Sequence, residues 1–355
     1  MRQALEHLLR QTWQTRGWLS CVLWPLSWFV GGLVAIKQAL YRWGVLTPDR
    51  LPVPVIVVGN VMVGGVGKTP IVMALVEHLT RQGLRVGVVS RGYGRDAQDR
   101  QNHPIREVTS HSLAHQVGDE PLLIHTRCQV PVWIGAQRAK AARALLAAHP
   151  DVQVIVSDDG LQHAALARDI ELCVFDERGI GNGWLLPAGP LREPWPRSAP
   201  ANTTHRFELN TSSSELAFAK QAHSVQRRLS EVAYQANGTQ RHLQHWQQHP
   251  AQALAGIAKP QVFFNMLQAQ GVQLTKTIPL PDHASTAELN AALVHAQHNP
   301  NDVLCTEKDA VKLWSTLPEV WAVPLVVELP QGLLDELQKA LSPLVMRPSH
   351  TASPN

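Results

Sequence analysis

The segment 59–70, which reads GNVMVGGVGKTP, contains the residues best suited to bind a phosphate group. An apolar run of β type at 53–58 precedes this segment, and a run of helix type at 71–79 follows it. Glycines allow backbone N–H groups to converge on one point, and the helix presents its positive end there. Lys68 adds a full charge for the terminal phosphates. Strand, glycine-rich loop, Gly-Lys-Thr and helix therefore predict a phosphate-binding loop, with an ordinary glycine turn as the alternative.

The loop departs from the usual G-x-x-x-x-G-K-[ST] spacing at one position. Met62 stands where glycine is usual, so we expect Gly64 and Gly65 to supply the conformational freedom. The hydroxyl of Thr69 is expected to bind Mg²⁺ beside the phosphates. The residues predicted to form the nucleotide-binding site at this loop are Gly59, Asn60, Gly64, Gly65, Val66, Gly67, Lys68, Thr69 and Pro70.

Asp158 and Asp159 stand at the end of an apolar run, 152–156, that has the composition of a strand. A carboxylate at the end of such a strand holds Mg²⁺ in phosphate-loop enzymes, directly or through water. Because a phosphate-binding loop lies upstream, we predict that at least one of the two carboxylates binds Mg²⁺. A solvated turn is the alternative.

Two other acidic segments are ambiguous when each is considered alone. In the segment 117–121, VGDEP, Asp119 could cap a helix that has Pro121 in its first turn. The pair Asp282 and His283 is typical of a turn or of a surface pair.

The N-terminal segment 18–36 has no charged residue. As a helix it would extend roughly 28 Å, which is close to the thickness of the hydrocarbon core of a bilayer. Basic residues flank the segment on both sides, and tryptophans near it suit a headgroup interface. A cleaved signal peptide and a buried helix of a soluble protein are the alternatives. The pattern favours a membrane-associated helix, spanning or lying in the interface, that is embedded from the cytoplasmic side.

Strand and helix patterns alternate along the rest of the chain. Strands are expected at 85–89, 152–156 and 170–175, and a helix at 136–148. This alternation predicts a mostly parallel sheet with helices on both faces and ligands at the carboxyl ends of its strands. The proline-rich stretch 187–200 and the polar run 202–214 indicate a domain boundary. A second α/β unit follows, with helices near 260–269 and 287–297 and strands near 272–278, 303 and 325–329.

The predicted fold class is thus α/β: a phosphate-loop three-layer α/β/α domain, a second and smaller α/β domain, and an N-terminal membrane-associated helix. The corresponding boundaries are 1–45 for the membrane-associated segment, 46–214 for the phosphate-loop domain, 215–345 for the second domain and 346–355 for a disordered tail.

Composition adds broad limits. The formal net charge of +4 suits an anionic partner without identifying one. We expect no nucleic-acid partner. The four cysteines show no C-x-x-C spacing, which favours reduced, structural cysteines in a cytosolic environment.

Taken together, the motifs resemble those of the tetraacyldisaccharide 4'-kinases, also called lipid A 4'-kinases. The resemblance extends from the apolar N-terminus to about residue 330. Besides the phosphate loop, it rests on SRGYGR at 90–95, VGDEP at 117–121, DDGLQH at 158–163, LLPAGPLREP at 185–194, PDH at 281–283 and TEKDAVKL at 306–313. Two positions depart from the family pattern. Leu161 stands where Phe is expected, and AGIAKP at 255–260 replaces a segment that is richer in glycine.

The resemblance implies an enzyme of lipopolysaccharide synthesis at the cytoplasmic face of the inner membrane. Such an enzyme moves the γ-phosphate of ATP, with Mg²⁺, to the 4'-hydroxyl of a tetraacylated glucosamine disaccharide 1-phosphate and forms lipid IVA. Its partners are the lipid substrate and the membrane surface. The resemblance also implies two α/β domains that face each other across the active site.

Residue roles follow from the same resemblance. The catalytic residues would be Lys68, at the ATP phosphates, and Asp119 with His283, as a base and the group that orients it. Thr69, Asp158 and Asp159 would hold Mg²⁺. Further matching positions at the site are Glu120, Arg192, Glu193, Arg91 and Tyr93.

Two other classes of protein remain compatible with the phosphate loop. One is a membrane-associated nucleotide switch or partitioning-type ATPase, and the other is a nucleotide-binding scaffold without chemistry. A kinase needs a base beside its acceptor, which Asp119 and His283 would provide, whereas a switch needs no such pair.

Overall fold

The computed structural model describes residues 12–197, 200, 203–212, 214–216, 218–219, 221–294 and 302–346. Contacts divide the chain into two compact units. Unit 1 comprises Met1–Arg91, Gln137–Gln226 and Leu329–Asn355, and unit 2 comprises Gly92–Ala136 and Arg227–Glu328. These units differ from the sequential domains that were predicted, because residues 92–136 pack with the second unit and residues 329–346 with the first. Apart from Met346, the predicted tail lies outside the described residues.

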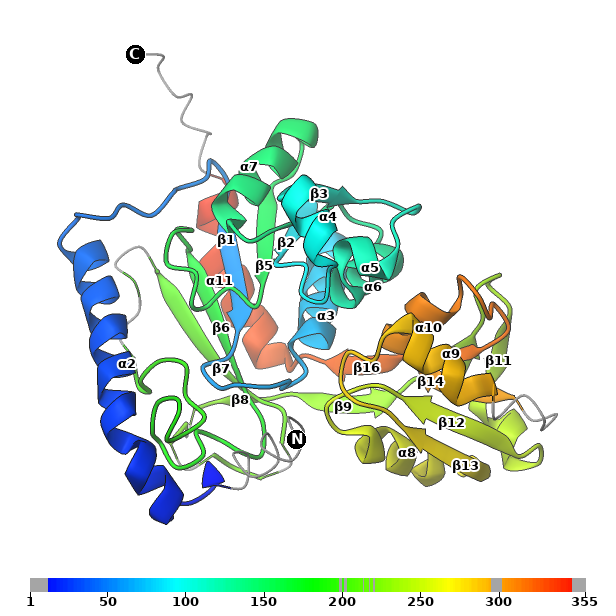
Figure 1. The fold of residues 1–355 in the computed structure, drawn as a ribbon. Coiled ribbons are helices and arrows are strands. Elements are labelled where there is room, and N and C mark those ends of the chain that lie inside the picture. The colour runs from blue at the N-terminus through cyan, green and yellow to red at the C-terminus, as the bar shows by residue number, and fades with distance from the viewer. Residues whose placement is uncertain are drawn as a thin grey trace. The chain divides into compact units, whose positions relative to one another are not determined.

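Unit 1 is built on parallel strands in the order β2-β5-β1-β6-β7-β8 (Figure 1). Every residue of β1, β2, β5 and β6 is buried, as expected of parallel strands that are covered on both faces. The bounds are β1 Val55–Gly59, β2 Val86–Ser90, β5 Val154–Asp158, β6 Ile170–Phe175, β7 His205–Asn210 and β8 His223–Ser224.

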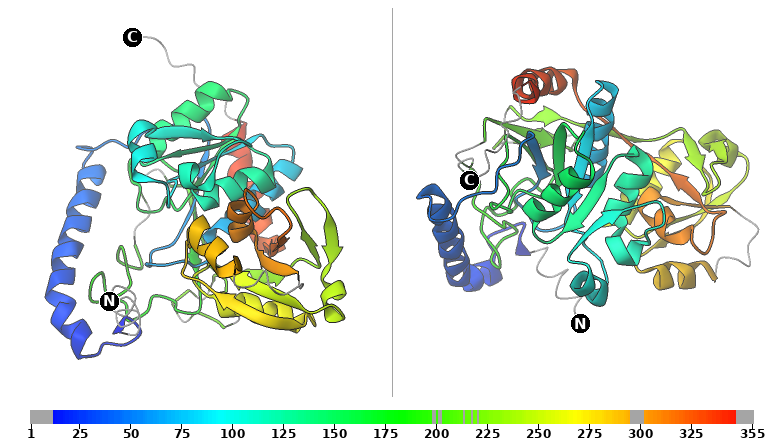
Figure 2. Two further views of the ribbon diagram at one scale, coloured as in Figure 1. Left: turned by 45° about the vertical axis from the view of Figure 1, so that its right-hand side comes forward. Right: turned by 90° about the horizontal axis from the view of Figure 1, so that it is seen from above.

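Helices cover both faces of this sheet. The helix α3 (Lys68–Arg81) and the helix α7 (Arg138–Ala148) lie on opposite faces, and α11 (Gln331–Val345) lies on the side of α3 (Figure 2). On Gly87 of β2, a Cβ would come within 2.7 Å of Leu145 on α7, so glycine permits this close approach. The predicted α/β/α arrangement with parallel strands is confirmed.

The polar run 202–214, which was expected to be a boundary, contains the strand β7 of this sheet. Its alternate residues Phe207 and Leu209 are buried, and β7 pairs in parallel with β6 along its whole length. Period-two burial explains the difference, since one face of the strand is polar in sequence while the other packs in the core.

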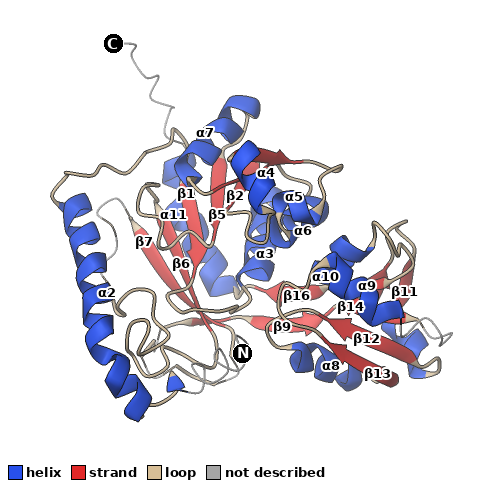
Figure 3. Cartoon of the chain, viewed as in Figure 1, coloured by secondary structure: helices blue, strands red, loops and turns tan. Residues whose placement is uncertain are grey.

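The N-terminal helix α2 (Trp18–Arg42) continues through Pro25 without a break (Figure 3). It lies along unit 1. The hydroxyl of Ser27 donates to the carbonyl of Leu185 at 2.8 Å, and the rings of Trp24 and Trp184 are 5.9 Å apart. Among the described residues, it is the one helix long and apolar enough to cross a membrane.

Unit 2 contains a six-stranded mixed sheet in the order β11-β10-β15-β14-β12-β13. Neighbouring residues of β12 (Ala251–Ala255) pack in different cores. Ala253 and Ala255 pack with α8 (Pro260–Ala269), whereas Leu254 packs with α9 (Thr286–Val294) and α10 (Glu307–Leu313). This alternation buries both faces of the sheet. The bounds are β10 Val232–Tyr234, β11 Gln240–His242, η1 Leu243–Gln247, β12 Ala251–Ala255, α8 Pro260–Ala269, β13 Leu274–Pro279, α9 Thr286–Val294, β14 Val303–Thr306, α10 Glu307–Leu313 and β15 Trp321–Val323.

The remaining elements of unit 2 are short. The strands β9 (Gln226–Leu229) and β16 (Leu325–Glu328) pair with each other, and β3 (Ile105–Val108) pairs antiparallel with β4 (Val132–Gly135). Three helices belong to the segment around β3 and β4: α4 Ala97–Asn102, α5 Ala114–Val117 and α6 Asp119–Cys128. The helix α6 carries the predicted acidic residue Asp119.

Candidate active site

The predicted phosphate loop of unit 1 connects β1 to α3. Gly64 and Gly67 have φ angles of 98° and 78°, in the region that favours glycine, and Gly67 directly precedes α3. Met62 is 2% exposed and bridges to Leu191, so its side chain belongs to the core. Positive φ at Gly64 therefore supplies the bend for which the usual motif has glycine at position 62.

Arg178, which the sequence did not single out, supports this loop from outside. Its guanidinium donates to the carbonyl of Gly65 at 3.0 Å and to the carbonyl of Val63 at 3.4 Å. Asp176, at the end of β6, accepts from the same guanidinium at 3.0 Å. Both bonds to the loop use its backbone carbonyls and not its N–H groups.

Lys68 begins α3, and its side chain is only 12% exposed. Its ammonium lies 3.4 Å from Asp159 and donates to the Oδ1 of Asn60 at 3.2 Å. Thr69, the next residue, is buried in the first turn of the same helix. The lysine of the loop is therefore held next to a strand-end carboxylate.

The two predicted strand-end carboxylates face different partners. Asp158 is the last residue of β5, pairs in register with Val58 of β1, and accepts from the hydroxyl of Ser90 at 3.3 Å. Asp159 follows with φ of 49°. Arg192 lies 3.3 Å from its carboxylate. Burial raises the pKa of Asp159, but the charges of Lys68 and Arg192 outweigh burial and leave the pKa lowered.

Gln162 links the remaining predicted residues of this site. It accepts from Arg192 at 3.2 Å and donates to Glu193 at 2.8 Å and to the carbonyl of Asn60 at 2.9 Å. The turn that carries Asp159 and Gln162 is held by Arg168, whose side chain is 1% exposed. That guanidinium donates to backbone carbonyls of the turn, among them Leu161 at 2.8 Å and His163 at 2.7 Å.

Arg91 lies near this cluster, just after β2, and its side chain is exposed. Burial, Arg138 and other nearby cations, Arg91 among them, lower the pKa of His163 to about 4. The imidazole of His163 is therefore neutral and accepts from the backbone N–H of Arg138 at 3.2 Å. We find no direct contact of Arg91 with the other predicted residues among those that the structure describes.

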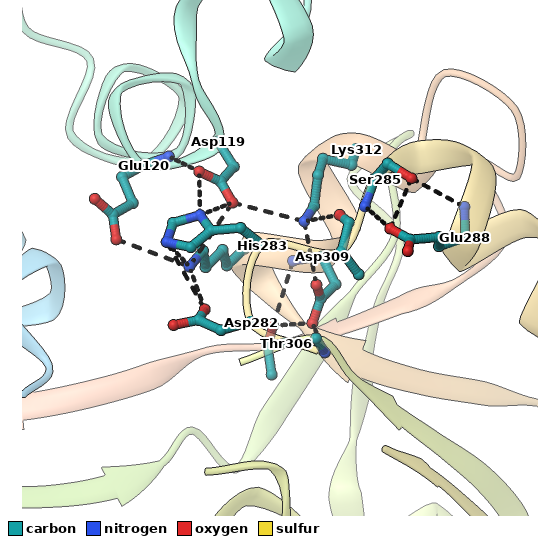
Figure 4. Close-up of polar contacts among 12 residues, drawn as sticks. Asp119, Glu120, Asp282, His283, Ser285, Glu288, Thr306, Asp309 and Lys312 are labelled. Atoms are coloured by element: carbon teal, nitrogen blue, oxygen red, sulfur yellow. Dashed lines mark hydrogen bonds and ion pairs between the residues drawn. The ribbon is translucent and has the colours of Figure 1, made fainter. Parts of the chain in front are cut away.

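Asp119 and His283, both in unit 2, meet directly. The Nδ1 of His283 lies 3.1 Å from one carboxylate oxygen of Asp119 and 3.3 Å from the other (Figure 4). Asp119 is the first residue of α6 rather than the cap before it, and its Oδ1 also accepts from the N–H of Glu120 at 3.0 Å. The bare helix-cap interpretation is therefore incomplete, because the carboxylate has a partner 164 residues away.

Backbone geometry brings this pair together. Gly118 has φ of 93°, and a Cβ there would lie 2.5 Å from the carbonyl oxygen of Tyr93, so only glycine fits before Asp119. His283 itself has φ of 60°, in a region that non-glycine residues rarely occupy. The centroid of the Tyr93 ring lies 4.9 Å from the centroid of the His283 ring, and the Tyr93 side chain is otherwise exposed. Such local strain is often found at functional sites.

Cations surround the Asp119 carboxylate. Lys308 and Lys312 of α10 lie 3.7 and 3.6 Å from its Oδ2, and Lys308 lies 3.8 Å from Glu120. Burial raises the pKa of Asp119, but the hydrogen bond to His283 and the charges of Lys308, His283 and Lys312 hold it well below its usual range. Asp119 is thus a stable carboxylate.

Lys312 is itself fixed by a buried partner. Its ammonium donates to the carbonyl of Ala284 at 2.8 Å and lies 3.5 Å from Asp309. Asp309 accepts from the hydroxyl of Thr306 at 2.7 Å and from the N–H of Gly256 at 2.9 Å. The TEKDAVKL motif, which was predicted without a role, therefore supplies both lysines. The signal available in the sequence was their spacing of four residues, which places them on one face of a helix.

The structure thus assembles the predicted residues in two groups. Lys68, Asp159 and Arg192 are in contact in unit 1, and Gln162 joins Glu193 to them. Asp119, Glu120, His283 and Tyr93 gather in unit 2.

A Gly-Lys-Thr loop at the carboxyl end of a parallel sheet, followed by strand-end carboxylates, is typical of the phosphate-loop class of nucleotide-binding proteins. A family model described as "Tetraacyldisaccharide-1-P 4'-kinase" matches residues 19–342. The chain belongs to this family, and the predicted kinase of lipid A biosynthesis is confirmed.

Individual relatives agree with the family. A tetraacyldisaccharide 4'-kinase from Acidovorax ebreus (strain TPSY) is 48% identical over 344 residues, covering 96% of each chain. One from Polaromonas naphthalenivorans (strain CJ2) is 47% identical over 348 residues, again covering 96% of each chain. Among solved structures, the "apo" form of LpxK from Aquifex aeolicus in complex with ATP is 26% identical, with a TM-score of 0.74, and the match covers 92% of this chain and 99% of that one.

Proposed function

We propose that this kinase transfers the γ-phosphoryl group of ATP to the 4'-hydroxyl of a tetraacylated glucosamine disaccharide 1-phosphate, forming lipid IVA at the cytoplasmic face of the inner membrane. The observation that carries the proposal is the 3.1 Å contact between Asp119 and His283. Transfer to a sugar hydroxyl benefits from a group that accepts its proton, whereas a nucleotide switch needs no such pair. The names of the relatives supply the acceptor class.

In this proposal, unit 1 holds the phosphate donor. The N–H groups from Gly64 to Thr69 and the ammonium of Lys68 bind the ATP phosphates. Lys68 exchanges its contact with Asp159 for the phosphates, while Arg192 keeps the Asp159 carboxylate in place. The ATP complex of the Aquifex aeolicus relative supports the assignment of ATP as the donor.

The oxygen atoms at the carboxyl end of β5 are ligands of the type that Mg²⁺ prefers. Mg²⁺ usually takes one or two carboxylates and completes its shell with water and substrate phosphates. Asp158 lies beside β1 just before the loop, and Thr69 follows the loop lysine, so these two residues would hold the ion. We assign Asp159 to hold Arg192 and, before ATP binds, Lys68, because both cations engage its carboxylate. When bound, Mg²⁺ neutralises charge that develops on the phosphoryl oxygens.

Unit 2 holds the acceptor in this proposal. Asp119 accepts the proton of the sugar hydroxyl, and His283 orients the carboxylate through Nδ1. A carboxylate with a lowered pKa is a weak base. Weak basicity is sufficient here, because phosphoryl transfer has a loose transition state and the hydroxyl becomes strongly acidic only as its bond to phosphorus forms.

The helix α2 would attach the enzyme to the membrane. Its exposed apolar residues recur at helical spacing along one face, at Trp18, Val22, Leu26, Phe29, Leu33 and Ile36. The opposite face packs on unit 1, where Ser20 and Ser27 are buried, and Lys37 donates to the carbonyl of Gln162 at 3.2 Å. A helix bound to a polar domain along its length fits the membrane interface better than a span. We therefore place α2 in the cytoplasmic interface with its apolar face in the lipid.

The test is a transfer assay with radiolabelled ATP and the disaccharide lipid in detergent micelles, with products separated by thin-layer chromatography. We expect label in a lipid product with Mg²⁺ present. A matched acceptor that lacks the 4'-hydroxyl should remain unlabelled. Release of inorganic phosphate without a labelled lipid would overturn the proposal and favour the nucleotide switch.

A further inference from the structure

Lys308 of α10 occupies a central position among the polar groups around His283. Its ammonium lies 3.0 Å from the Oδ1 of Asp282, and its side chain is 15% exposed. It also lies 3.7 Å from Asp119 and 3.8 Å from Glu120, so it balances several carboxylates at once. Its most informative contact is with the Nε2 of His283, at 3.3 Å.

This contact determines which imidazole nitrogen carries the proton. A lysine ammonium has only donor hydrogens, so the Nε2 of His283 must accept from Lys308 with its lone pair. In a neutral imidazole the other nitrogen is then protonated. That nitrogen, Nδ1, faces the Asp119 carboxylate at 3.1 Å, and a carboxylate can only accept. The three groups therefore form one consistent chain of donors and acceptors.

We propose that Lys308 is a positioning residue that holds His283 as the neutral Nδ1–H tautomer against Asp119. This inference rests on the proposed role of Asp119 and His283 at the acceptor. A neutral Nδ1–H orients the carboxylate without adding a further positive charge to it. Asp119 is consequently a stronger base than it would be opposite an imidazolium, and the active enzyme is the form with neutral His283.

The charges around His283 oppose one another. Burial lowers the pKa of His283 and so does Lys308, whereas the hydrogen bond to Asp119 and the charges of Asp119 and Asp282 raise it, and the net pKa is raised. The groups that face the imidazole are Asp119 from α6, Lys308 from α10, Asp282 from its own turn and the ring of Tyr93. If Lys308 is removed, the carboxylates lose their compensating charge, and His283 should take up a proton.

Nitrogen NMR of the full chain in detergent micelles, with ¹⁵N-labelled histidine, tests this directly. The resonance is assigned by its disappearance in His283→Gln. Above its pKa, His283 of the unmodified enzyme should show a protonated Nδ1 and an unprotonated Nε2. In Lys308→Met, the pKa of His283 should rise by at least about one unit. Lys308→Arg keeps a donor and should leave the tautomer unchanged. Lys276→Met, on the exposed face of β13, should change nothing.

The pH dependence of kcat gives the second readout. The acidic limb of the profile should move to higher pH in Lys308→Met by the same amount as the NMR pKa, with most of the rate recovered on the alkaline side. A purely structural role would lower kcat at every pH without moving the limb, and this would overturn the proposal. The proposal would also be overturned by an unprotonated Nδ1 in the unmodified enzyme, or by an unchanged pKa of His283 in Lys308→Met.

The two proposals fail in different ways. Full activity of Asp119→Ala would refute the acceptor role and leave the NMR result unaffected. If Lys308→Met does not fold, the tautomer of the unmodified enzyme decides the question, and the titration of Lys308→Arg supports or refutes it independently.

Discussion

Asp119 and His283 are expected to act as one unit, and the structure sets the size of the coupling between their substitutions. The Nδ1 of His283 lies 3.1 Å from a carboxylate that is 6% exposed. A charge-assisted hydrogen bond of this kind is worth about 1.5–3 kcal/mol. Asp119→Ala removes the proposed base and should lower kcat by about 100-fold, or about 2.7 kcal/mol. His283→Ala removes the hydrogen bond and should lower kcat by about 10–100-fold.

The double variant distinguishes a unit from two independent residues. Independent losses would multiply to about 10³–10⁴-fold, whereas a unit should leave the double variant no more than about threefold slower than Asp119→Ala. The corresponding coupling energy is about 1.4–2.7 kcal/mol. Steady-state transfer of radiolabelled phosphate to the lipid measures kcat and KM, and the KM for ATP should change little, since neither residue belongs to the phosphate loop.

Matched controls are available on the exposed surface. Asp335→Ala on α11 and His249→Ala after η1 make the same chemical changes at exposed positions and should leave kcat unchanged. Multiplicative losses in the double variant would refute the unit. A normal kcat in Asp119→Ala would leave that residue as the first residue of a helix and nothing more.

The remaining predictions concern unit 1. Lys68→Ala should lower turnover by about 100-fold, since a charge contact to a developing anion is worth about 2.7 kcal/mol, and retention of more than a tenth of the rate in the transfer assay would contradict the phosphate-loop assignment. Asp158→Ala should raise the Mg²⁺ concentration for half-maximal activity by at least about tenfold, and an unchanged Mg²⁺ titration would argue against ligation. Arg168→Met should cost about 3 kcal/mol of unfolding free energy in urea titrations, because it removes the buried donor of the backbone carbonyls of Leu161 and His163. Leu26→Glu with Phe29→Glu should release the enzyme from membranes in a sedimentation assay at high salt, because both side chains are more than half exposed on α2; quantitative pelleting would show another anchor.

Features that depend on neighbouring residues were accessible from the sequence. β6 and α8 occupy the predicted ranges, because a run that is apolar except for Glu171, and a proline at the first helical position, define them locally. The phosphate loop could also be predicted from the sequence, since its strand, glycines, lysine and helix follow one another directly in the chain. The predicted sheet class followed from the alternation of strand and helix.

Features that depend on distant segments were not accessible in the same way. The grouping of residues 92–136 with unit 2 follows from packing, and no composition change marks it. β7 was hidden in a polar run, because only one of its faces is buried. Gln162 and Arg178 indicate no role by themselves, and their roles depend on contacts with Glu193 and with the carbonyl of Gly65, which lie elsewhere in the sequence.

The sequence by itself determined the phosphate loop, the sheet class and the apolar face of the N-terminal helix, because periodicity and short-range spacing fix which residues share a loop or a helix face. The tertiary structure alone decided that His283 meets Asp119 across 164 positions of chain, that the left-handed backbone at Gly118 and His283 aims them at each other, and that Lys308 occupies the far side of the imidazole. Those contacts depend on how α6, α10 and the turn at 281–283 pack together, and such packing has no signature in local sequence.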